Sequence, residues 1–184
     1  MLKVNHTFFI CFIIILILGC SSASKRPTNR DIGTTLENKE FKMNFTVAQP
    51  MVTQALSQIA LSGLLPPGST INRIDLNGDN NFFKMYGDSV AADLSYYGER
   101  QMGGGYTSKT GIVFQGVPKD LEFQKDNGKN NYTIKFTISS DTEVFMANAI
   151  ISSNGTCSLD LWSSHRTRIR YLGRIEEIEE DKRR

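Results

Sequence analysis

The clearest chemistry in the sequence belongs to a cysteine that ends an apolar segment. Phe8–Leu18 is an unbroken apolar run, preceded by Lys3 and followed by Gly19-Cys20. The run is shorter than the roughly 20 residues that span a bilayer, and it fits the apolar core of a signal peptide. Two apolar residues, a small residue and then cysteine form the lipobox pattern, in which the thiol takes a diacylglyceryl group before signal peptidase II cuts. We therefore expect a lipid anchor on Cys20, with an ordinary secretory signal cut near Ala23, or an uncleaved anchor, as the alternative.

Three tyrosines and an arginine gather around Gly98. Tyr96 and Tyr97 precede the glycine, and Arg100 and Tyr106 follow it. Because a strand would place Tyr96 and Tyr97 on opposite faces, packing in the core or at a barrel rim is the simpler explanation. The functional interpretation is a binding rim in which Arg100 contacts an anionic group.

Arginines recur at even positions near the C-terminus: Arg166, Arg168 and Arg170, with Arg174 beyond them. An extended strand would put them on one face. We expect a solvated outer face whose charge is offset by the glutamates of residues 176–180. Contact with anionic lipid headgroups or with an acidic partner is the functional alternative.

The remaining polar residues form no pattern for catalysis or for a metal. His165 follows Ser163-Ser164 directly, whereas a catalytic triad is assembled from residues brought together in space. The segment Asp75-x-Asn77-x-Asp79 begins like a calcium loop but lacks its glycine and its final acid. Cys157 would be the one free cysteine of the mature chain, which leaves no disulfide and no zinc site. We expect no catalytic residue, no metal and no cofactor.

The elements that carry these residues are almost all strands. Apolar and polar residues alternate in four clear segments: Phe41–Val47, Val90–Tyr97, Tyr132–Ile138 and Cys157–Leu161. Tight-turn residues separate these and several shorter segments. The pattern predicts an all-β, mainly antiparallel fold, a meander barrel or strongly curved sheet of about 8–10 strands. One short N-terminal helix or ordered loop is expected between Pro50 and Leu61, where it would cap one end of a barrel.

The chain divides into four parts. We assign residues 1–19 to a lipoprotein signal peptide, 20–39 to a lipid-anchored flexible tether, 40–178 to a single β-domain and 179–184 to a charged tail. The formal net charge of +2 gives no argument for nucleic acid as a partner.

Several segments in order resemble one family. The longest is Asp88-Ser89-Val90 followed by Leu94–Arg100, and the others are Phe114 with Pro118, Asn154-Gly155, and Arg168–Gly173. Together they resemble the signature of the lipoprotein family called domain of unknown function 4251, found in Bacteroidetes. The resemblance covers about residues 41–178 and implies a lipid-anchored, secreted β-domain with no established activity. Ser95 stands where the family usually has proline, and Arg170 where it often has serine.

These observations favour a lipid-anchored protein of the cell envelope. Because no acidic cluster follows Cys20, we expect the periplasmic face of the outer membrane. The protein would be a non-enzymatic module that contacts the membrane through its anchor and binds a small ligand or a neighbouring envelope protein. An assembly factor that pairs with its partner by a sheet edge is one alternative, and an enzyme is the other.

Overall fold

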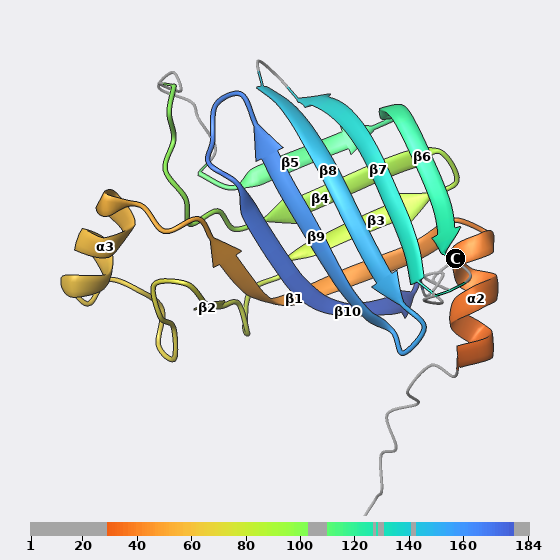
Figure 1. Ribbon diagram of the computed structural model, residues 1–184, viewed down its shortest axis with the longest axis horizontal. Coiled ribbons are helices and arrows are strands. Elements are labelled where there is room, and N and C mark those ends of the chain that lie inside the picture. Colours follow the sequence, from red (N-terminus) through yellow and green to blue (C-terminus); the bar gives the residue numbers. More distant parts are fainter. Residues whose placement is uncertain (1–28, 103–109, 127, 129–130, 141–142, 179–184) are drawn as a thin grey trace, which may run out of the picture.

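Nine long strands form one antiparallel sheet that curls on itself (Figure 1). The computed structural model describes residues 29–102, 110–126, 128, 131–140 and 143–178. Along the sheet the order is β5-β4-β3-β1-β10-β9-β8-β7-β6, and the short β2 (Ile74–Asp75) pairs with β1. The long strands are β1 (Glu40–Pro50), β3 (Phe82–Tyr86), β4 (Ser89–Leu94), β5 (Ile112–Gly116), β6 (Lys119–Asp126), β7 (Asn131–Ser140), β8 (Glu143–Ser152), β9 (Thr156–Ser163) and β10 (Ile169–Glu177). The predicted all-β, strongly curved antiparallel sheet is confirmed.

The first and last long strands pair with each other and join two meanders. Met43 of β1 lies opposite Ile175 of β10, and β1 also pairs with β3 on its other side. In Figure 1, β6 to β9 form a front layer, and β3 to β5 cross behind it. The sheet ends at β5 on one side and at β6 on the other.

The space between the two layers is filled by aromatic and aliphatic side chains. Phe83 of β3 stacks on Phe136 of β7 with ring centroids 5.6 Å apart, and Phe114 of β5 lies 5.8 Å from Phe145 of β8. Each pair joins a strand of the rear layer to a strand of the front layer. In strands such as β7 alternate residues point inward, which explains why the period-2 pattern was readable in the sequence.

Helix α2 (Asn29–Glu37) corrects the predicted tether, because part of residues 20–39 belongs to the folded domain. Ile32 and Leu36, one helical turn apart, are both buried in the core. Ile32 lies against the turn between β8 and β9 at Gly155, and Glu37 is 3.6 Å from Lys125 of β6. The helix covers one end of the sheet (Figure 1). Two apolar residues in an otherwise polar segment are too few for a helical period to show in the sequence.

Helix α3 (Gln54–Leu61) forms within the segment where a helix or ordered loop was predicted. The Oγ1 of Thr53 caps its N-terminus by accepting a hydrogen bond from the backbone N–H of Leu56. Pro50, at the start of that predicted segment, is the last residue of β1. Within α3 only Leu56 is buried, and the helix stands apart from the sheet at the end opposite α2 (Figure 1). It does not cap the barrel as predicted.

Candidate binding site

The end of the sheet away from α2 is built from two connections that run side by side. The segment after β4 donates a hydrogen bond from the backbone N–H of Gln101 to the carbonyl of His165, at 2.8 Å. In return, the backbone N–H of Thr167 donates to the carbonyl of Glu99, at 3.1 Å. These bonds fix residues 99–101 against the connection between β9 and β10.

Tyr96 holds the two connections together with its side chain. Its hydroxyl lies 2.9 Å from the Oγ1 of Thr167 and 3.0 Å from the carbonyl oxygens of both Glu99 and Thr167. The guanidinium of Arg166 sits over the Tyr96 ring, 5.0 Å from its centroid. Burial raises the pKa of the Tyr96 hydroxyl above its ordinary value. The hydroxyl of Tyr96, a predicted rim residue, is therefore hydrogen-bonded within the protein.

Arg166 is buried, which contradicts its predicted place on an outer basic face. Its Nε donates to both carboxylate oxygens of Glu143, at 2.9 and 3.0 Å, and its Nη1 donates to the carbonyl of Thr110, at 3.2 Å. Ser163 also donates to Glu143, and the Nη2 of Arg100 reaches the same carboxylate at 3.4 Å. Arg166 precedes the first residue of β10, so the strand alternation used to place it does not apply. Arg100, the expected anion contact, faces a carboxylate instead.

Arg168 and Arg170 are half exposed and share one acid. Their side chains donate to Asp160 of β9, with closest distances of 2.8 and 2.9 Å. The Asp160 side chain is 2% exposed, because the two arginines and the neighbouring strands surround it. Asp160 therefore offsets part of the charge of these arginines. Of the glutamates predicted for this role, Glu179 and Glu180 lie outside the described residues.

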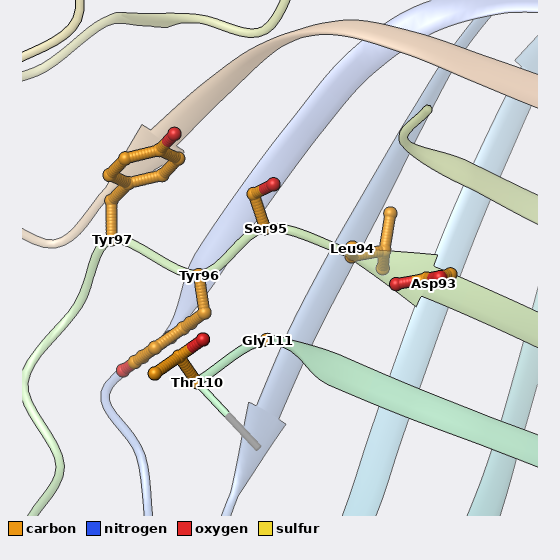
Figure 2. Close-up of a pocket in the computed structure, with 7 residues that line it drawn as sticks. All are labelled: Asp93, Leu94, Ser95, Tyr96, Tyr97, Thr110 and Gly111. Carbon is orange, nitrogen blue, oxygen red and sulfur yellow. The ribbon is translucent and has the colours of Figure 1, made fainter. Parts of the chain in front are cut away.

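A pocket of about 390 Å³ opens between the end of β4 and the start of β5 (Figure 2). Its lining residues are Asp93, Leu94, Ser95, Tyr96, Tyr97, Thr110 and Gly111. Two of these, Tyr96 and Tyr97, were predicted rim residues, while Tyr106 falls outside the described residues. Sequence reasoning missed Asp93, Ser95 and Thr110. Asp93 was visible only as a polar position in the alternating segment Val90–Tyr97, and Thr110 carried no signal.

The backbone at the pocket is fixed from the protein interior. The hydroxyl of the buried Tyr171 donates to the carbonyl of Ser95, at 2.9 Å, and the N–H of Ser95 donates to the Oδ1 of Asn81, at 2.6 Å. The pocket is therefore preformed.

The environment of Tyr97 is negative. Burial raises the pKa of the Tyr97 hydroxyl, and the negative charge of Asp79 raises it further.

Two further observations concern the described residues only. They hold no group of three or more histidine, cysteine or acidic side chains placed to bind a metal ion. None of the helices in these ranges is long and apolar enough to cross a membrane.

Comparison with known proteins identifies relatives by sequence and by fold. The model of the family described as "Domain of unknown function (DUF4251)" matches residues 25–175, from just before α2 to the last strand. A similar solved structure is the crystal structure of a DUF4251 family protein from Bacteroides eggerthii DSM 20697, with a TM-score of 0.54 and 9% sequence identity. The similarity covers 81% of this chain and 87% of that chain, and at this identity it shows a shared fold alone. No curated protein matches the sequence.

Proposed function

The chain belongs to the DUF4251 family, a family of unknown function, and we propose that it is a lipid-anchored, non-enzymatic envelope protein that docks a partner protein. The docking surface is formed by exposed apolar residues of α3 and of the segments on either side of it. The observation that carries the proposal is an ordered helix that leaves most of its large apolar side chains in solvent, at the end of the domain away from its N-terminal helix (Figure 1).

The anchor in this proposal is a lipid on Cys20, supported by the lipobox residues before it. Residues 20–28 separate that cysteine from α2 and can reach about 30 Å when fully extended. The chain then enters the folded domain at α2, so this end faces the anchoring membrane. We place the protein on the periplasmic face of the outer membrane, because no acidic cluster follows Cys20.

We define the α3 surface by its five exposed large apolar residues: Met51, Val52, Ile59, Leu61 and Leu64. The exposed fraction is 88% for Leu61 and 75% for Leu64. No charged residue occurs between Lys42 and Arg73, although 22% of the whole chain is charged. Exposed large apolar side chains gathered in one uncharged segment support an interaction site here.

The α3 surface is held in a fixed conformation. Thr53 caps the helix, Leu56 is buried, and Leu65 packs against the core after the helix ends. Little conformational entropy is lost when a preformed surface binds. Full burial of Leu61 and Leu64 would contribute about 3–6 kcal/mol before the costs of association.

A protein is the occupant that this geometry favours. Because α2, where the chain from Cys20 enters the domain, lies at the other end, we expect the α3 surface to point away from the anchoring membrane (Figure 1). The surface carries no charge, so the partner's matching surface would be apolar and uncharged as well.

The sheet-edge alternative is weaker at β6, one of the two edge strands, because this strand is protected against pairing. It carries five charged residues (Lys119, Asp120, Glu122, Lys125 and Asp126), and its register with β7 shifts between Lys119 and Glu122. Charges and bulges of this kind discourage the addition of another strand. For the enzyme alternative, the buried acid Glu143 would be the obvious general base, but it already accepts from Arg166 and Ser163.

Site-specific photo-crosslinking of the full-length protein in its own cells tests the proposal. A photoreactive residue at Leu61 or Leu64 should give one discrete adduct with another protein. The matched control is Val117, an apolar residue that is 71% exposed in the turn between β5 and β6, and it should give none. An adduct of two copies of this chain, crosslinking to lipid alone, or equal crosslinking at Val117 would refute partner docking by α3.

A further inference from the structure

Two arginines at the start of β10 share a single buried acid on the outer face of the sheet. Arg168 donates from its Nε and Nη2 to the Oδ1 of Asp160, at 3.1 and 2.8 Å. Arg170 donates from its Nε to both oxygens of Asp160, at 3.0 and 3.1 Å, and from its Nη2 to the Oδ2, at 2.9 Å. The carboxylate therefore fixes both guanidinium groups in place. We call these two residues the arginine pair.

One positive charge of this group has no acid to offset it. The single carboxylate of Asp160 offsets one of the two guanidinium charges, and the next cross-strand neighbours are neutral, Asn148 on β8 and Gln49 on β1. Glu99 comes near through its backbone, because its carbonyl accepts from the N–H of Thr167. Its exposed side chain forms no ion pair with either arginine in the part of the chain that the structure describes.

The arginine pair also keeps free hydrogen-bond donors. A guanidinium carries five N–H donors, and each arginine uses its Nε and Nη2 on Asp160. The Nη1 groups of Arg168 and Arg170 make no hydrogen bond within the described ranges. Because the two side chains are 51% and 46% exposed, a second carboxylate can reach these groups.

Two apolar side chains share this face of the sheet. Trp162, the only tryptophan of the chain, follows Asp160 by two residues on β9 and so points to the same side. It is half-buried and does not belong to the core, and Met146 opposite it on β8 is 36% exposed. Tryptophan, methionine and arginine are residue types that are enriched where proteins bind one another.

We infer that the arginine pair binds an acidic segment of a partner protein, in which an aspartate or glutamate lies beside an apolar side chain. The partner's carboxylate accepts from the free guanidinium donors, whose positions Asp160 has already fixed, and its apolar neighbour packs on the side of Trp162. Different side chains carry this inference and the docking proposed for α3.

The position of the arginine pair favours a protein over an anionic lipid. The N–H of Met51, just before α3, donates to the carbonyl of Arg168 at 3.1 Å, so the pair lies at the α3 end of the domain. Helix α2, where the chain from Cys20 enters, lies at the other end (Figure 1). The choice of a protein rests on the proposed anchor at Cys20, whereas the preference for a carboxylate does not.

Two blocked tripeptides that differ only in charge test the inference: acetyl-Leu-Glu-Leu-amide and acetyl-Leu-Gln-Leu-amide. Because Trp162 is the only tryptophan, its indole N–H gives a single NMR peak in the full-length protein in nonionic detergent, and the shift of this peak during titration measures each affinity. We expect the glutamate peptide to bind about fivefold more tightly, the size of effect that an exposed ion pair supplies. The difference should shrink as salt is added.

Arg170→Gln assigns the preference to the arginine pair. It leaves one arginine on one carboxylate, so the net charge of the group disappears while Asp160 stays paired with Arg168. This variant should remain folded and bind the two peptides equally. The matched control is Arg174→Gln on the same strand, where the exposed arginine donates to the carbonyl of Asn154 instead, and this variant should keep the preference.

Equal binding of the two peptides by the wild type, or an unchanged preference in Arg170→Gln, would overturn the inference. Detergent micelles doped with phosphatidylglycerol test a lipid as the occupant, and we expect them to leave the Trp162 peak in place. A shift of that peak on doping that Arg170→Gln abolishes would put a lipid headgroup at the arginine pair and refute the protein partner.

Discussion

Removing one partner of the buried Arg166–Glu143 pair should destabilise the protein strongly. The two side chains are 5% and 7% exposed, and breaking a buried pair costs about 3–5 kcal/mol because a charge is left uncompensated. Arg166→Met leaves Glu143 with Ser163 and the long contact to Arg100, so we expect about 3 kcal/mol. Glu143→Met leaves the Arg166 guanidinium with one hydrogen bond, to the carbonyl of Thr110, beside the Tyr96 ring, so we expect about 4 kcal/mol.

Urea denaturation of the purified variants measures these changes. The matched control is Lys39→Met, which breaks the exposed pair with Asp88 and should cost less than about 1 kcal/mol. The double variant Arg166→Met/Glu143→Met should be more stable than the sum of the single effects predicts, by roughly 2 kcal/mol, because it leaves no unpaired charge. Single effects no larger than that of Lys39→Met, or additive effects, would refute this account of the cluster.

The same variants test whether the Arg166–Glu143 pair holds together the two connections of the candidate site, residues 99–101 and the segment between β9 and β10. The amides of Gln101 and Thr167 donate the bonds that join the two connections, so in Arg166→Met they should lose hydrogen-exchange protection before the sheet does. If their protection falls only in step with global stability, the pair does not fix these segments.

Three further predictions concern the anchor, a glycine and the free cysteine. Cys20→Ser should leave an unprocessed precursor that radioactive palmitate does not label; labelling and normal maturation of this variant would rule out the lipid anchor. Gly98→Val should cost about 2 kcal/mol in a denaturation experiment, because a Cβ there would lie 2.7 Å from the Oγ1 of Thr167 and closer still to the Tyr96 hydroxyl; an unchanged midpoint would show that the segment yields freely. Burial raises the pKa of Cys157 from 9.0 to about 12, so the folded state keeps a proton that the unfolded state loses above pH 9. The stability contributed by the protonated Cys157 thiol is therefore complete below pH 9 and is lost as the pH rises toward 12, which comparison with Cys157→Ala should show. Rapid maleimide labelling of the folded protein at pH 8 would contradict the burial of Cys157.

The curved sheet was predictable because each strand and turn shows a pattern within a short segment of the sequence. Alternation in segments such as Tyr132–Ile138 reports one buried face, and turn residues such as Asn154-Gly155 mark where the chain reverses. The pairing of β1 with β10 was not readable, because it joins residues more than a hundred positions apart with no local signal. Helix α2 was missed for a related reason. Ile32 and Leu36 can be recognised as core residues only once the strands that they pack against are known.

Two of the four predicted rim residues lie at a pocket, and the contacts of the others could not be predicted from the sequence. Tyr96 and Tyr97 do line a pocket at the end of β4, and their clustering near a glycine located it. The role of Arg166 depends on Glu143, which lies 23 residues earlier in the chain, and no spacing rule connects the two. The sequence therefore suggested free arginines where the fold supplies a neutralised pair, and it did not single out Asp93.

The central claim is that a partner covers the α3 surface in the envelope, and thiol labelling of intact envelopes tests it most directly. Leu64→Cys and the control Val117→Cys have similar exposure at 75% and 71%, and the native Cys157 is buried. We predict that maleimide labels Leu64→Cys about tenfold more slowly in envelopes than in the purified protein, as for a site that is covered about 90% of the time. Val117→Cys should react at the same rate in both preparations. Labelling of Leu64→Cys in envelopes as fast as in the purified protein would contradict the account.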